Sequence, residues 1–94
     1  MLKHIVTWKM KEENKAENMA EIKSRLEALV GVIDEIKSLQ VGINENGGEY
    51  DIILITDFEN KKDLETYDSH PAHQEVRSFV RSVVETRIAV DFNY

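Results

Sequence analysis

The chain has 94 residues, which suits one domain near the lower end of the sizes that fold alone, so we expect a single domain over residues 1–94. Its 18 acidic residues outnumber its 12 basic ones, and the net charge of −6 argues against a nucleic-acid partner. The absence of cysteine excludes disulfides and thiolate nucleophiles, and the longest aliphatic run, IILI, is far too short to span a membrane.

Residues 2–10 alternate between two faces, which predicts a β-strand. One face carries Leu2, His4, Val6, Trp8 and Met10, and the other carries Lys3, Ile5, Thr7 and Lys9. The same stretch, MLKHIVTWKM, lacks the apolar block and cleavage site of a signal peptide, so we expect a cytoplasmic protein.

The next three elements follow from spacing and turn residues. Apolar residues recur at helical spacing over about residues 17–30, and Gly31 is a natural end for this helix. Residues 36–44 predict a second strand, because Leu39, Val41 and Ile43 alternate on one face. The turn residues of ENGGE then predict a hairpin into a third strand over residues 50–58.

This third strand is apolar on both faces. Ile52 and Leu54 point one way, whereas Ile53 and Ile55 point the other. A strand with two apolar faces is buried on both, yet in a lone two-layer domain the second face would meet water. The pattern is either a local excess of β-branched residues or the sign of a second subunit, which we favour. We therefore expect a homodimer through the face that bears Ile53 and Ile55.

Two helices and a strand complete the pattern. Asn60, with Asp63 three positions later, marks the start of one helix, which ends before Pro71. Pro71 suits the first position of a further helix that runs to about Val84, and residues 86–94 alternate as a fourth strand. This element order predicts an α+β fold of the ferredoxin-like, split βαβ type, with a four-stranded antiparallel sheet and helices on one face.

Two of the three histidines flank the only proline, in the segment DLETYDSHPAHQEV. His70 is expected to be the N-cap of the following helix, although Ser, Thr, Asp and Asn are commoner there. His73 lies three residues before Val76 and seven before Val80, on the inward face, and in the first turn, where the helix dipole disfavours imidazolium. A neutral imidazole there is either a base or ligand partner, or a core histidine satisfied by a backbone carbonyl.

The third histidine shares the first strand with apolar residues. If the helices cover the face that holds His4, then His4 and His73 point into one layer, with Tyr67 at its rim. The other sheet face would instead send His4 away from His73. The acidic residues have no tight metal spacing with the histidines, so we expect no metal site. The expected pocket walls are Val6, Trp8, Leu26, Leu54 and Phe79.

Three motifs resemble the stress-responsive α/β-barrel (Dabb) family over essentially the whole chain. They are KHIV at the start, Y-x-x-H-P-x-H before the last helix and VDF near the end. The resemblance implies a dimeric α+β barrel, in which two ferredoxin-like subunits press their sheets together. In a plant member, an aromatic polyketide cyclase, the first-strand histidine and the second histidine of HPxH serve catalysis. These positions correspond here to His4 and His73, with Tyr67 as the motif tyrosine and His70 in a structural role.

What the resemblance implies for activity is less specific, because most family members have no assigned reaction. This chain also carries aliphatic residues (Met19, Ile22 and Leu26) where aromatic residues of the first helix line the cyclase pocket. Haem-degrading monooxygenases share the barrel, with His73 as a conceivable axial ligand, but we expect no cofactor.

Two hypotheses on function stay open, and both involve a small apolar or aromatic ligand. The first is a cyclase-like or lyase-like enzyme that performs acid–base chemistry on a small, largely apolar carbonyl compound. In it His73 is the base, and Tyr67 and His4 position the oxygen. The second is a non-catalytic ligand-binding or stress-response protein, in which the same groups only orient the ligand.

Overall fold

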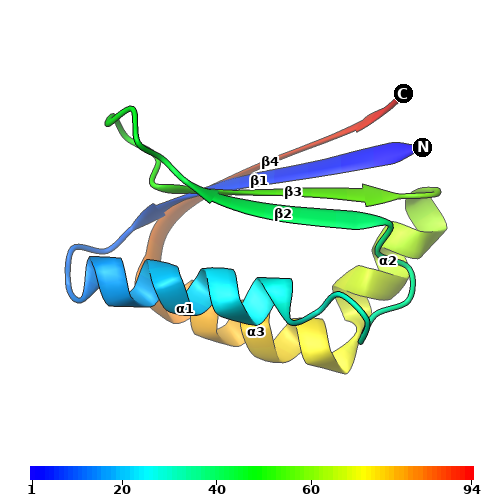
Figure 1. Cartoon of the computed structure of the whole chain (residues 1–94), viewed down its shortest axis with the longest axis horizontal. Coiled ribbons are helices and arrows are strands. Elements are labelled where there is room, and N and C mark those ends of the chain that lie inside the picture. The colour runs from blue at the N-terminus through cyan, green and yellow to red at the C-terminus, as the bar shows by residue number, and fades with distance from the viewer.

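The computed structural model describes all 94 residues. It contains one antiparallel sheet with the strand order β2-β3-β1-β4 and three helices on one of its faces (Figure 1). The elements are β1 (Leu2–Met10), α1 (Lys15–Glu27), β2 (Ser38–Ile43), β3 (Ile52–Phe58), α2 (Lys61–Ser69), α3 (Pro71–Val83) and β4 (Val84–Asn93). The predicted ferredoxin-like α+β fold is confirmed. None of the three helices is long and apolar enough to cross a membrane.

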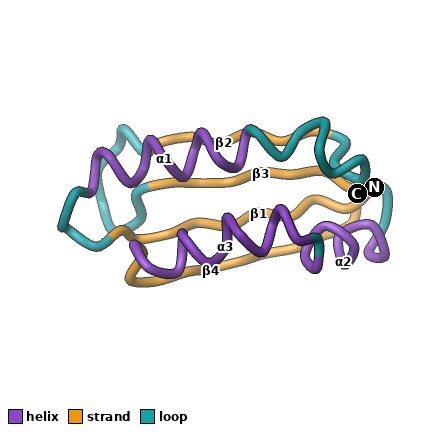
Figure 2. Tube along the Cα trace, turned by 90° about the horizontal axis from the view of Figure 1, so that it is seen from below, coloured by secondary structure: helices purple, strands orange, loops and turns teal.

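The helices form a second layer under the sheet. Seen from the helix side, α1 runs below β2 and β3, α3 runs below β1 and β4, and the short α2 sits at one end (Figure 2). All five residues of the β1 face predicted to hold His4 are buried against this layer. The alternation therefore placed His4 on the helix side of the sheet, as the convergence of the histidines requires.

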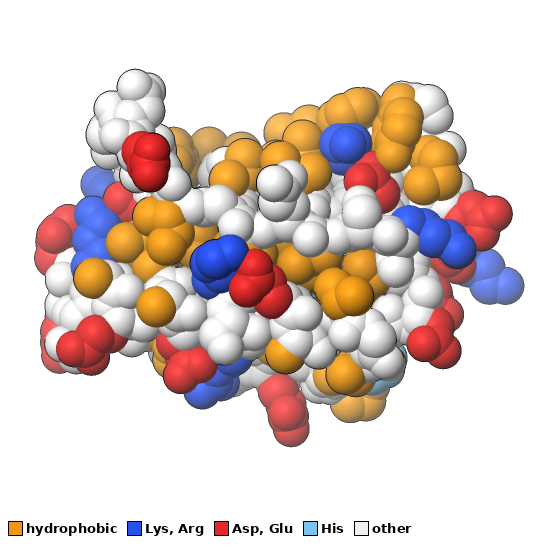
Figure 3. Space-filling model, viewed as in Figure 1, with side chains coloured by type: hydrophobic (Ala, Val, Ile, Leu, Met, Phe, Trp, Pro, Cys, Tyr) orange, Lys and Arg blue, Asp and Glu red, His pale blue; other side chains and the backbone are white.

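The other face of the sheet is apolar and carries no helix. Across the central strands Ile5 pairs with Ile55 and Val90, and Thr7 pairs with Ile53 and Ile88. Ile53 and Ile55 are half-buried, whereas Ile88 and Val90 are 46% and 54% exposed. Hydrophobic side chains accordingly line the upper surface of the molecule (Figure 3). We call this the outer face.

The first helix ends earlier than the sequence pattern suggested. It stops at Glu27, and the chain then tightens into three-residue turns, in which the N–H of Leu29 donates to the C=O of Leu26 at 3.1 Å. Leu29 and Ile33 are buried, so the apolar spacing of the helix continues beyond its end. Both residues lie in turns and not in the helix. Gly31, at φ 88°, sits within these turns in the left-handed region that glycine favours.

The junction between α2 and α3 follows the predicted capping. The Asn60 side chain accepts the Asp63 N–H at 2.9 Å at the start of α2. His70 Nδ1 accepts the Ala72 N–H at 3.1 Å, and Pro71 is the first residue of α3. The prediction of His70 as an N-cap is confirmed.

At its other end α3 passes directly into β4. Val83 is the last helical residue, and Val84, with extended backbone, is the first of the strand. The corner is tied to the end of β1, because the N–H of Lys11 donates to the C=O of Val83 at 3.0 Å and Met10 pairs with Val84. From this corner β4 rises steeply out of the helix layer into the sheet (Figure 1). The space between α3 and the sheet is therefore bounded by this corner at one end and by α2 at the other (Figure 1).

Candidate functional site

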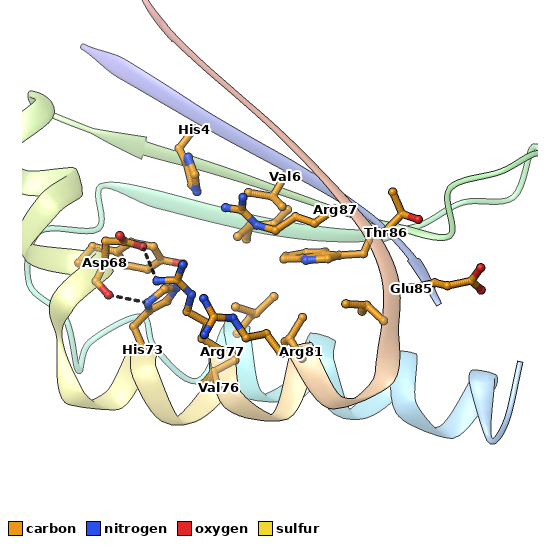
Figure 4. Close-up of a pocket in the computed structure, with 16 residues that line it drawn as sticks. His4, Val6, Asp68, His73, Val76, Arg77, Arg81, Glu85, Thr86 and Arg87 are labelled. Atoms are coloured by element: carbon orange, nitrogen blue, oxygen red, sulfur yellow. Dashed lines mark hydrogen bonds and ion pairs between the residues drawn. The ribbon is translucent and has the colours of Figure 1, made fainter. Parts of the chain in front are cut away.

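A cavity of about 360 Å³ occupies this space between α3 and the sheet (Figure 4). Its volume falls within the range typical of small-molecule sites. Every element except β2 contributes to its lining. Of the site residues predicted from sequence, those that line it are His4, Val6, Trp8, Leu26, Leu54, Tyr67 and His73.

Phe79 is the predicted wall residue that the structure does not bring to the cavity. Its ring lies under the guanidinium of Arg25 on α1, with the Arg25 Cζ 4.2 Å from the ring centroid. The inward side of α3 is thus divided between two neighbours. Val76 and Val80 face the cavity, whereas Phe79 packs against α1. The prediction for Phe79 is corrected accordingly.

His4 reaches the cavity from β1 and is held by a carboxylate of β4. Figure 4 shows its ring pointing from the sheet toward the helices. Its Nδ1 is hydrogen-bonded to Oδ1 of Asp91, the residue that pairs with His4 across the β1–β4 ladder. Because the carboxylate accepts, Nδ1 carries a proton and Nε2 is the free nitrogen. Asp91 therefore fixes the orientation and the tautomer of His4.

His73 reaches the cavity from the first turn of α3. Its Nδ1 lies 3.0 Å from the backbone oxygen of Asp68. A carbonyl can only accept, so Nδ1–H is the donor and the lone pair of the neutral ring is on Nε2. Burial lowers the pKa of His73 below its ordinary value, although the bond to the Asp68 carbonyl and the charge of Asp68 oppose the shift. His73 thus combines a fixed tautomer with a preference for the neutral form.

Tyr67 lies close to both histidines and deeper than predicted. Its ring centroid is 4.3 Å from that of His73 and 6.4 Å from that of His4. The sequence placed Tyr67 at the rim of the pocket, whereas the side chain is completely buried. Its position near the end of α2 does not show this depth; Phe58, at the end of β3, packs against the ring with the two centroids 5.0 Å apart.

The hydroxyl of Tyr67 is the one buried side-chain polar group without a hydrogen-bond partner. A buried hydroxyl left unpaired costs roughly 1–3 kcal/mol, so native structures rarely keep one without a reason. Burial also raises the pKa of Tyr67, and the Asp68 carboxylate adds to this effect. The phenol is therefore a neutral donor at physiological pH, and it is unpaired in a cavity wall.

Sequence reasoning missed the charged part of the lining. Arg77 and Arg81 on α3 and Arg87 at the start of β4 all line the cavity. The spacing of His73, Arg77 and Arg81, four residues apart each time, was the available signal, since such residues share one helix face. Arg87 and Asp91, also four residues apart, share one face of β4.

The cavity does not have the donor set of a metal centre. No group of three or more His, Cys, Asp or Glu side chains converges anywhere in the chain. What the site offers is two imidazole nitrogens and a phenol in an apolar wall, with guanidinium groups beside them. These are groups for proton transfer and for holding oxygen atoms.

The fold and the site together define a class, a ferredoxin-like α+β protein with a cavity between its helix layer and its sheet. The chain matches the model of the Stress responsive A/B Barrel Domain (Dabb) over residues 2–94, and it belongs to this family. None of the curated proteins matches the chain.

Solved structures share the fold over nearly the full length. A dimeric protein of ferredoxin-like fold and unknown function from Bacteroides fragilis is 33% identical, covering 99% of this chain and 95% of its own, with a TM-score of 0.93. The protein At3g17210 from Arabidopsis thaliana is 24% identical over 100% and 95% of the two chains, at a TM-score of 0.88. The hydroxynitrile lyase from Passiflora edulis is 14% identical over 97% and 90%, at a TM-score of 0.86.

The His73 imidazole should titrate below pH 6.5, the ordinary value for histidine. Its burial opposes the charged form more than its hydrogen bond favours it. The unfolded chain then takes up this proton first as the pH falls, so the stability that neutral His73 contributes is lost from about pH 6.5 downward through its folded pKa. The measurement is the imidazole Hε1 chemical shift against pH by NMR, with the resonance assigned from a His73→Gln variant. A midpoint above pH 6.5 would show that the Asp68 carbonyl outweighs burial.

Proposed function

We propose that the cavity binds a small, largely apolar carbonyl compound and that His73 acts on it as a general base. The observation that carries this proposal is that His73, His4 and Tyr67, whose buried hydroxyl is unpaired, line one cavity. The walls also include apolar residues such as Val6, Trp8 and Val80, which suit the body of such a ligand. A carbonyl oxygen is the acceptor that the Tyr67 hydroxyl lacks.

The chemistry follows from the protonation states of the three groups. Nε2 of His73 takes a proton from the carbon next to the carbonyl, and the electron pair of that C–H bond forms a C=C bond while the carbonyl π pair moves to oxygen. Tyr67 donates its O–H to the enolate oxygen, and His4, oriented by Asp91, holds the same oxygen when its Nε2 is protonated. The enolate then takes the proton back, attacks a second carbonyl as in a cyclase, or expels a leaving group as in a lyase.

The comparisons support the architecture of this proposal. The Passiflora hydroxynitrile lyase shares the fold, at an identity that carries the fold alone. It is an example of a lyase with this fold of helices over a sheet. The assignment of the base rests on the tautomer and burial of His73 in this chain.

Proton abstraction can be tested with a neutral aryl ketone, 4-phenyl-2-butanone, in deuterated buffer. The protein should accelerate loss of the α-proton NMR signals, and His73→Gln should lower that acceleration by roughly a hundredfold or more, the usual contribution of a general base. The matched control is His70→Gln, which removes a histidine that caps α3 outside the cavity and should leave the rate within about twofold. Equal rates in wild type and His73→Gln would contradict the role of His73. Binding without exchange would identify a non-catalytic ligand-binding protein.

We also propose that two copies of the chain associate through the outer face. Three apolar residues lie side by side across β3, β1 and β4 on this face and form a continuous apolar surface. They are Ile55, Ile5 and Val90. The loop between β2 and β3 rises above the same face (Figure 1), where it would flank a second copy. The Bacteroides fragilis protein, at 33% identity, is dimeric.

Ile53→Asp should weaken this dimer strongly, because it would bury an unpaired carboxylate at the centre of the contact. The matched control is Val32→Asp, which makes the same kind of change at a 56% exposed residue in the turns after α1. Sedimentation velocity at micromolar concentration should show a dimer for wild type and Val32→Asp and a monomer for Ile53→Asp. A wild-type monomer under these conditions would refute the association.

A further inference from the structure

Arginine is concentrated at the cavity. The chain has four arginines, and three of them, Arg77, Arg81 and Arg87, line this one cavity. The fourth, Arg25, stacks on Phe79 on the α1 side of α3. Such a concentration of positive charge is unexpected by chance in an acidic protein with a net charge of −6. Figure 4 shows the guanidinium groups directed from α3 and β4 into the space between them.

Two of these guanidinium groups have no carboxylate partner. Arg77 lies 3.7 Å from Asp68, and the other lining carboxylate, Glu85, lies 4.0 Å from Lys9. The nearby carboxylate of Asp91 is bound to His4. Arg81 and Arg87 take part in no ion pair and in no side-chain hydrogen bond, although the chain has 18 acidic residues to offer.

The polar groups of the cavity are sorted by depth. Tyr67 and His4 are buried and His73 is half-buried, whereas Arg81 and Arg87 are exposed. Tyr67 and the two histidines therefore lie inside, and the unpaired positive charges lie at the mouth. The lining also includes apolar residues, among them Val6, Val76 and Val80.

We propose that the ligand carries a carboxylate, which Arg81 and Arg87 bind at the mouth while its carbonyl group lies inside near Tyr67 and His73. This inference deepens the proposed function, on which it rests, by naming the substrate class as small oxo acids with an apolar body. Guanidinium matches a carboxylate with two parallel N–H···O bonds, the planar arrangement that makes arginine preferred over lysine at such sites. The cavity, at about 360 Å³, lies near the small end of ligand sites and suits a compact anion.

The test compares two probes that differ only in the anion. They are 2-oxo-4-phenylbutanoate and 4-phenyl-2-butanone, in which a methyl group replaces the carboxylate. Isothermal titration calorimetry on the wild-type protein at pH 7 and low salt should show the acid binding roughly tenfold or more tightly than the ketone, because hydrogen bonds between charged groups are the strong ones. Salt at 0.5 M should reduce this preference.

Arginine variants then locate the preference. Arg81→Gln and Arg87→Gln should each weaken binding of 2-oxo-4-phenylbutanoate roughly fivefold to tenfold and leave 4-phenyl-2-butanone unchanged. The matched control, Arg25→Gln, should change neither affinity, since Arg25 lies outside the cavity. Circular dichroism would verify that each variant is folded.

The outcomes separate this inference from the function on which it rests. Equal affinity for the two probes, or a preference that survives in both cavity variants, would refute the carboxylate site while the carbonyl pocket stands. An effect of Arg81→Gln and Arg87→Gln on deuterium exchange of the ketone, with its affinity unchanged, would assign the arginines to the enolate instead and refute the inference. Tight binding of the acid without any exchange of its α-protons would support the carboxylate site and contradict the base. Binding of neither probe would refute both.

Discussion

The corner at which α3 becomes β4 sets the shape of the site. No residue separates the helix from the strand, and the Lys11–Val83 hydrogen bond ties the corner to the end of β1. The helix layer and the sheet are therefore joined at this end, and His4 and His73 lie toward the other end, beside α2 (Figure 4). Side chains from α3 and β4 on either side of the corner, such as Arg81 and Arg87, then lie on two walls of the same cavity. The cavity is a consequence of the chain path rather than of a missing side chain.

Away from the corner, β1, α2 and α3 each contribute one polar group to the cavity. Burial gives these groups their chemical character. It favours the neutral forms of His73 and Tyr67 by lowering the pKa of the one and raising that of the other, and hydrogen bonds to the Asp68 carbonyl and to Asp91 set the tautomers of the two histidines. The partners of the histidines are supplied by the protein, and the partner of the Tyr67 hydroxyl is not. A ligand oxygen would complete the set.

Much of this arrangement was predictable because it depends on local rules. Alternation along β1 decides which face holds His4, and the capping of Asn60 and His70 with Pro71 places the two helix starts. The predicted fold and the choice of histidines follow from these. Two details of the walls did not. Phe79 is one residue from Val80 on the helix, and only the position of α1 decides that it packs against Arg25. The arginines resemble a solvated surface in the sequence, since their convergence needs the corner between α3 and β4, which no local pattern encodes.

The central claim is that the Tyr67 hydroxyl is kept unpaired for a ligand, and the Tyr67→Phe variant tests it most directly. Urea unfolding and titration with 4-phenyl-2-butanone should be measured on the same protein. Removing an unsatisfied buried hydroxyl should leave the free energy of unfolding unchanged or raise it by about 1 kcal/mol, while binding of the ketone weakens roughly fivefold. A loss of stability of more than about 1 kcal/mol with unchanged binding would show that the hydroxyl serves the fold and would contradict the account.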